Sequence, residues 1–318
     1  MKPKYVGYFN EFGNGLNPWK MIATHAIFDS SDLTGLKEAF EHFGLVVVRR
    51  VYDKEETQRF YELQKKFCGI GDEDIKRVVS GEIKPVVGGT PALTEPGFWP
   101  LIVNENTKRI VAEILPGVPA TEFGTSAGAH YSARGLHRDF PQWYKMPKSG
   151  MSLERPSDTS LRILIYPSKQ GVTAGTFGAV PFSHRRDLYE RYAKQLGIKH
   201  SFDWFEMHRD LIKKAVATGD TKELDEMESN IDWVAADPGD VVLLDSKMQH
   251  SGDFITGPRY LFTTSFAKEN EFILNTLRQR WSTGMKPHEV GYYEYLHANG
   301  LASEQLVHEC RAYAAKAA

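Results

Sequence analysis

Three residues have the types and spacing of a metal site. His137 and Asp139 are separated by one residue. In an extended segment, residues i and i+2 point to the same side, so both side chains can reach one ion. His250 follows a strand-like run at 241–244 and is the best candidate for a third ligand. Two imidazoles and one carboxylate on one face of a metal leave positions open for co-substrates, as in non-haem iron oxygenases. We predict a metal centre of these three residues.

The same His-Arg-Asp sequence occurs a second time, as His208 and Asp210, inside a segment of helical character at 205–217. In a helix, residues i and i+2 are about 200° apart and face away from each other. The two side chains therefore cannot chelate one ion. The sequence predicts that this second pair lies on a solvated helix surface and binds no metal.

An arginine follows the last candidate ligand and opens a strand-like segment at 259–266. A guanidinium inside a barrel can bind a carboxylate through two parallel hydrogen bonds. We expect Arg259 to bind an anionic co-substrate, and Arg162, in the strand-like segment 161–166, is the second candidate. Strand alternation places four residues on the face that we take as interior: Arg259, Leu261, Thr263 and Ser265.

Further arginines and aromatic residues lie near the candidate ligands in the sequence. A surplus of guanidinium groups around a cavity suggests a substrate with a carboxylate or phosphate and an apolar body, such as a small amino acid or a carboxylated natural product. Ion pairing of these arginines at the barrel rim remains an equal alternative. The candidates for substrate contact are Arg138, Phe140, Trp143 and Tyr166.

The elements that must position these residues are predicted from periodicity. The N-terminal part predicts a helix capped within 29–31 and ended by Gly44, followed by a buried strand at 45–48. Asp53 and Glu56 have the spacing of a capping box at the start of the next helix.

From about Thr121 the pattern changes to short strands and turns, which favours a sandwich or barrel over a parallel sheet. A helical, charged insertion at 185–228 interrupts it, and we expect a lid or an oligomer contact there. Residues 302–315 predict a C-terminal helix. The expected strands are 161–166, 177–180, 233–236, 241–244 and 259–266, with a turn at 237–240.

Composition limits the class of protein. The chain has 318 residues, 41% of them hydrophobic, without internal repeats or an obvious linker, so we expect one domain over 1–318. A net charge of -2 gives no bulk attraction for nucleic acid or anionic lipid. Cys68 and Cys310 form no CxxC-type pattern, which fits a reducing compartment. We find no signal peptide and no run of 18 apolar residues, so the expected location is the cytoplasm.

Taken in order, these motifs resemble the phytanoyl-CoA dioxygenase-like (PhyH) family. The resemblance implies a mainly β fold with flanking helices, a double-stranded β-helix (cupin-like jelly roll) that carries the helical insertion. It also implies Fe(II), 2-oxoglutarate and O2, with Arg259 as the 2-oxoglutarate arginine. Phe182 departs from the family's usual Pro-Gly-Ser-His. The segments that carry the resemblance are 44–50, 137–139, 175–184, 239–245, His250 and Arg259.

The implied reaction is oxidation of a small-molecule substrate with release of succinate and CO2. Asp139 stands where related halogenases carry Gly or Ala, so hydroxylation, desaturation or ring formation is favoured over halogenation. Three alternatives stay open: an iron oxidase of this fold that does not use 2-oxoglutarate, a non-catalytic jelly-roll binding protein, and a zinc hydrolase. The oligomeric state is open as well, a homodimer included.

Overall fold

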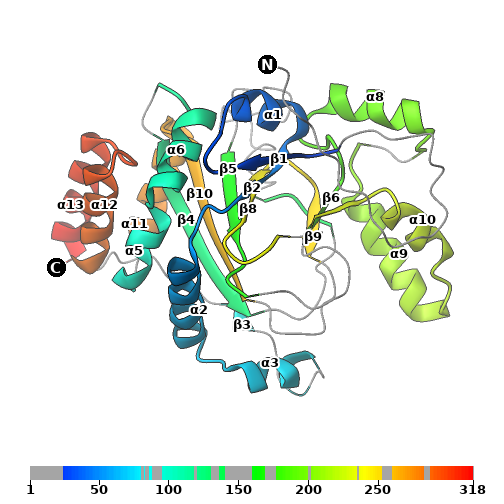
Figure 1. The fold of residues 1–318 in the computed structure, drawn as a ribbon, viewed down its shortest axis with the longest axis horizontal. Helices are drawn as coiled ribbons and strands as arrows, with labels where there is room; N and C mark the ends of the chain where they lie inside the picture. The colour runs from blue at the N-terminus through cyan, green and yellow to red at the C-terminus, as the bar shows by residue number, and fades with distance from the viewer. Residues whose placement is uncertain are drawn as a thin grey trace.

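The computed structural model describes residues 24–79, 82, 86–87, 95–117, 120–129, 136–139, 160–168, 177–199, 202–234, 236–252, 260–282 and 287–317. Figure 1 shows the strands in the middle of the molecule, with α11, α12 and α13 at one end and α8, α9 and α10 at the opposite end.

The strands form a larger and a smaller sheet. The larger sheet has the order β1-β2-β8-β5-β10-β4-β3, and the smaller has the order β7-β6-β9. Only β1 and β2 pair in parallel among the described strands; the other pairs are antiparallel. The strands are β1 (Ala26–Asp29), β2 (Leu45–Arg49), β3 (Val86–Val87), β4 (Ala120–Ala129), β5 (Ser160–Ile165), β6 (Phe177–Ala179), β7 (Asp232–Val234), β8 (Val241–Asp245), β9 (His250–Gly252) and β10 (Tyr260–Lys268).

Helices come before, between and after the strands in the chain. One group, α8 to α10, separates β6 from β7, and another, α11 to α13, follows β10. The helices are α1 (Leu36–Phe43), α2 (Lys54–Cys68), α3 (Asp72–Val79), the 3-10 helix η1 (Pro96–Phe98), α5 (Trp99–Ile102), α6 (Glu105–Ile114), α8 (Arg186–Leu196), α9 (Phe205–Thr218), α10 (Lys222–Glu228), α11 (Glu271–Ser282), α12 (Pro287–Ala298) and α13 (Glu304–Ala317).

The two faces of the larger sheet pack into different cores, as the alternation of β5 shows. Leu161 and Ile163 belong to the large cluster that also contains the buried residues of the flanking helices. Leu164 and Tyr166 belong to a second cluster, which they share with residues of the smaller sheet such as Phe177. Arg162 has the same parity as this second set, so it lies on the face toward the smaller sheet. The two sheets therefore face each other across the second cluster.

The N-terminal predictions are confirmed except for one boundary. The capping box of Asp53 and Glu56 is present at the start of α2, and Gly44 ends α1 with a left-handed backbone. Helix α1 starts later than expected, after Gly35, because the side chain of Asp29 instead accepts the backbone N–H of Ser31 in a local turn.

The fold is more helical than the sequence predicted. The predicted strands and the insertion are present with small shifts of boundary, but the described helices contain more residues than the described strands. The expected mainly β class is therefore corrected to a mixed class of two sheets and flanking helices. None of the described helices is long and apolar enough to span a membrane.

Candidate metal centre

The three predicted ligands lie together. One ligand atom from each of His137, Asp139 and His250 can be chosen so that all lie within 4.8 Å of one another, the one such group of His, Cys, Asp or Glu side chains in the described part of the chain. Nε2 of His250 is 3.6 Å from Oδ2 of Asp139, and Nε2 of His137 is 4.0 Å from Oδ1. The three side chains therefore converge from two segments that are far apart in the sequence.

Backbone pairing holds these two segments in register. His137 N–H donates to the carbonyl of His250 at 3.0 Å, and His250 N–H donates to the carbonyl of His137 at 2.9 Å. The imidazole centroids are 4.3 Å apart. The extended geometry predicted for the His-Arg-Asp segment is thus what brings both of its ligand side chains to His250.

His250 is fixed in the protonation state that a metal ligand needs. Burial lowers the pKa of His250 to about 3, aided by the neighbouring His137 and opposed by Asp139. In the neutral ring, Nδ1–H donates to the carbonyl of Met248 at 3.1 Å, which leaves the Nε2 lone pair directed at Asp139 and His137. Phe177 stacks on the same ring with centroids 5.2 Å apart.

Arg162 contacts the carboxylate of this group. Its Nη1 lies 3.1 Å from Oδ2 of Asp139, and its Nη2 donates to the hydroxyl of Thr263 at 3.0 Å. The guanidinium thus contacts two protein groups, and the expected role of Arg162 as the second candidate for binding the anionic co-substrate stays a prediction.

Arg138, a candidate for substrate contact, makes its contacts within the protein. The side chain is buried, and Nη1 donates to the carbonyls of Ser183, at 2.7 Å, and Lys247. The guanidinium also lies over the ring of Phe202, 4.8 Å from its centroid. Because Arg138 is between two ligands on an extended segment, its side chain leaves on the opposite side from them and ties that side to neighbouring backbone. These contacts are with the protein's own backbone and with Phe202, and the expected substrate contact of Arg138 stays a prediction.

The other predicted substrate and co-substrate residues divide into two groups. Tyr166 is fully buried and packs in the second core cluster, and its expected contact with substrate stays a prediction. Arg259, Phe140 and Trp143 lie outside the described residues.

The second His-Arg-Asp sequence was interpreted as a solvated helix surface, and for His208 this interpretation is wrong. Asp210 is exposed and pairs with Lys213, as expected for a helix surface. His208, by contrast, is only 3% exposed. Its Nδ1 accepts the backbone N–H of Leu136 at 3.2 Å, and its Nε2 is 2.9 Å from Oε1 of Glu228. Helical periodicity correctly predicted that the two side chains point away from each other. It could not predict that other segments of the chain cover the side of the helix that carries His208.

His184 lies in the turn that follows β6. Its Nε2 donates to the carbonyl of Glu41 at 3.0 Å, and burial lowers the pKa of its imidazole to about 4. The ring packs against Gly44, where an added Cβ would lie 2.5 Å from Nδ1. His184 therefore supports the packing of α1 and does not belong to the metal group.

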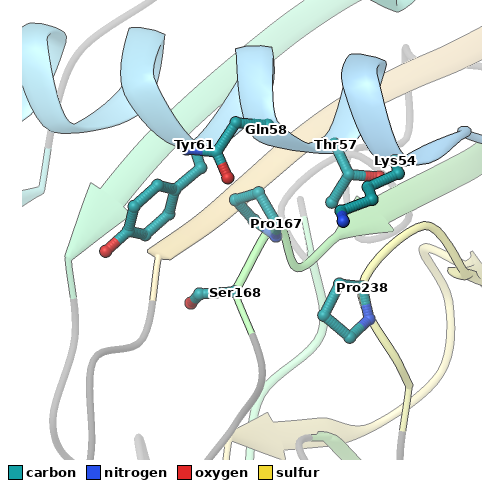
Figure 2. A pocket seen from close by; sticks show the side chains of 7 residues that line it. All are labelled: Lys54, Thr57, Gln58, Tyr61, Pro167, Ser168 and Pro238. Atoms are coloured by element: carbon teal, nitrogen blue, oxygen red, sulfur yellow. The ribbon is translucent and has the colours of Figure 1, made fainter.

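A pocket of about 430 Å³ lies beside α2, and none of the residues that line it is a candidate metal ligand. Figure 2 shows side chains of α2, among them Gln58 and Tyr61, above Pro167 and Ser168 at the end of β5. Pro238, in the turn before β8, closes another side.

No protein-family model matches this sequence, and no curated protein matches it. One solved structure with some likeness is the non-heme alpha ketoglutarate dependent epimerase SnoN from nogalamycin biosynthesis. It is 15% identical, with a TM-score of 0.44, and the likeness covers 74% of this chain and 82% of that chain.

Proposed function

We propose that the chain is an Fe(II)- and 2-oxoglutarate-dependent oxygenase that oxidises a small molecule. The observation that carries this proposal is the convergence of His137, Asp139 and His250, with one ligand atom from each within 4.8 Å of the others. Two imidazoles and one carboxylate are the donor set of the facial triad in non-haem iron oxygenases.

The donor set fits a divalent transition metal in detail. His250 is neutral, and its Nδ1–H is held by the carbonyl of Met248, as a ligand imidazole requires. Side chains of the group range from 7% exposed for His250 to 30% for His137, so the site is sheltered but can be reached. The bound iron and 2-oxoglutarate would supply the oxidation of a substrate C–H bond by O2, with release of succinate and CO2.

The chain's own residues have three tasks in this proposal. The triad holds the metal, Arg162 orients the Asp139 carboxylate, and Arg259 binds the distal carboxylate of 2-oxoglutarate. Arg259 is assigned this task from the sequence, where it has the parity of Thr263 and Ser265. Arg162 is less suited to it, because its guanidinium already contacts Asp139 and Thr263.

The substrate is proposed only as a small molecule, an amino acid or a carboxylated natural product being the classes to test first. The surplus of arginines that suggested an anionic substrate is smaller than expected, since Arg138 and Arg162 contact protein groups. A carboxylic acid and its methyl ester, assayed side by side, would show whether substrate charge matters.

The test is anaerobic reconstitution with Fe(II), followed by addition of O2 and 2-oxoglutarate and measurement of succinate over panels of amino acids, acyl thioesters and secondary metabolites. Succinate formed by the wild type and not by Asp139→Ala supports the proposal. Substrate oxidation without any need for 2-oxoglutarate would instead indicate an iron oxidase. Failure to bind iron would indicate a binding protein, and hydrolysis dependent on zinc without O2 a hydrolase.

A further inference from the structure

The helical insertion contacts the metal centre at the segments that carry both histidine ligands. It comprises α8, α9 and α10, and Figure 1 shows α9 and α10 on the same side of the molecule as β6 and β9. The contacts come from one short stretch, the residues that lead into α9 and its first turn, Phe202 to His208. We call this stretch the brace.

The first contact joins the brace to the His137 segment. Leu136, the residue before His137, donates its backbone N–H to Nδ1 of His208. An imidazole that accepts at Nδ1 carries its proton on Nε2, so Nε2–H donates to the carboxylate of Glu228 on α10. These two hydrogen bonds connect α10, through His208 on α9, to the segment that carries His137. The imidazole of His208 is almost fully buried.

The second contact joins the brace to the His250 segment. The amide of Gln249, the residue before His250, is fully buried. Its Oε1 accepts the backbone N–H of Trp204 at 2.6 Å, and its Nε2 donates to the carbonyl of Phe202 at 2.7 Å. The Gln249 side chain thus forms hydrogen bonds with two backbone groups of the brace, one through its amide oxygen and one through its amide nitrogen.

The third contact lies between these two. The guanidinium of Arg138 stacks over Phe202 while donating to the carbonyls of Ser183 and Lys247. The brace itself is kept rigid by helical pairing, since His208 N–H donates to the carbonyl of Trp204 at 2.8 Å. The residues next to each histidine ligand are therefore attached to the same rigid turn.

We propose that the brace positions the two histidine ligands, with His208 and Gln249 as the positioning residues. Between His137 and His250 the backbone supplies two hydrogen bonds at an isolated bridge, and β9, which carries His250, also pairs with β6. The brace adds an attachment that these backbone pairs do not supply, because it contacts both segments immediately before the ligands. Metal affinity accordingly depends on the insertion, and metal binding in turn stabilises the contacts of the brace. This inference rests on the proposed function in that it requires a metal at the triad.

The test uses Co(II) as the probe, because its d–d absorption reports ligand geometry as well as binding. The full-length chain is titrated with Co(II) against a chelator, as wild type and as four variants. His208→Gln loses the acceptor for Leu136 N–H. His208→Asn keeps an amide oxygen close to the Nδ1 position, and Gln249→Leu loses both contacts with the brace. Asp210→Ala, on the exposed side of the same helix, is the matched control.

Substitution of residues that support metal ligands typically lowers metal affinity roughly 10- to 100-fold. We expect a loss of about that size for His208→Gln and Gln249→Leu, with an altered Co(II) spectrum. His208→Asn should recover most of the affinity, and Asp210→Ala should bind as the wild type does. Wild-type affinity and spectrum in folded His208→Gln and Gln249→Leu would overturn the inference and leave the proposed function intact. No Co(II) binding by the wild type would overturn both.

Hydrogen exchange on the wild type covers the case in which a variant does not fold. Adding Co(II) should slow amide exchange at residues 202–208 as well as at the ligand segments, and should have no such effect in His137→Ala. Protection of the ligand segments without any change at 202–208 would contradict the coupling.

Discussion

Arg162 and Asp139 form an ion pair inside the candidate metal centre, with Nη1 3.1 Å from Oδ2. Arg162 lies on the face of β5 that points to the smaller sheet. Its other terminal nitrogen, Nη2, donates a hydrogen bond to the hydroxyl of Thr263 on the neighbouring strand β10. In the proposed metal site, this guanidinium would help to orient the Asp139 carboxylate.

Substitution of Arg259 and substitution of Arg162 should therefore change different measured constants. Arg259→Ala should raise the KM for 2-oxoglutarate roughly 10- to 100-fold, as expected for loss of a charge-assisted hydrogen bond of about 1.5–3 kcal/mol. Arg162→Gln should chiefly lower metal affinity, because Asp139 loses its orienting partner. Steady-state KM values and chelator titrations on both variants give the answer. The reverse pattern would assign the 2-oxoglutarate site to Arg162.

Removal of a ligand should remove the metal. His137→Ala, Asp139→Ala and His250→Ala each delete one of the three protein ligands, so iron content after anaerobic reconstitution and activity should fall to background. Asp210→Ala removes the carboxylate of the second His-Arg-Asp sequence and should keep the full metal content. A ligand variant that still binds one iron per chain with wild-type affinity would place the metal elsewhere.

Gly44 should be intolerant of a side chain. Its φ is +68°, and an added Cβ would lie 2.5 Å from Nδ1 of His184 and 2.8 Å from Sδ of Met248. Gly69 is the matched control, because it has a φ of +63° but nothing within 4 Å. We expect Gly69→Ala to lower the free energy of unfolding by about 1–2 kcal/mol, and Gly44→Ala by a further 1–3 kcal/mol or so. Equal losses in urea unfolding would show that the packing around His184 yields easily.

Glu122 should make stability depend on pH. Burial raises the pKa of Glu122 to about 7 from 4.5, against the lowering effect of Arg280 and of hydrogen bonds such as that from Gly124 N–H. Between these two pH values the folded chain keeps a proton that the unfolded chain has lost, so this group's contribution to stability falls as pH rises. The slope is at most about 1.4 kcal/mol per pH unit.

Glu122→Gln keeps an acceptor for Gly124 and removes the titration. The free energy of unfolding of the variant relative to the wild type should therefore rise with pH between about 4.5 and 7 and stay flat outside that window. A difference curve that is flat throughout would mean that Glu122 is ionised in the folded chain across this range.

The sequence predicted the local features of the fold well where one physical rule decides them. The alternation of β10 predicted that Leu261, Thr263 and Ser265 share the interior face, and the register places Thr263 opposite Leu164 and Ser265 opposite Arg162. Likewise the capping box and Gly44 act within a few residues of the chain, so no tertiary information was needed.

Other elements had no such local signal. Strand β4 contains Gly124 and Gly128 and lacks an apolar alternation, although it forms a ten-residue strand beside β10. Helix α12 buries Tyr292 and Tyr293, neighbours in sequence, so its apolar residues do not gather on one helical face. Tertiary packing decided both.

The candidate site shows the same division. The convergence of its candidate ligands could be predicted, because residue type and i, i+2 spacing are properties of the sequence alone. The role of His208 could not, because it depends on Leu136 and Glu228, which reach it from other parts of the chain. For the same reason the partners of Arg138, the carbonyls of Ser183 and Lys247, could not be predicted.

The hydrogen bonds between His137 and His250 run entirely through peptide groups. The position of the two ligands is consequently encoded separately from their chemical identity, because a different side chain at either residue leaves the same peptide groups to pair. A single codon change can therefore alter the ligand set while the frame stays in place. Such a site is well suited to acquire a new metal preference or a new reaction in small steps, in natural lineages as well as in directed evolution.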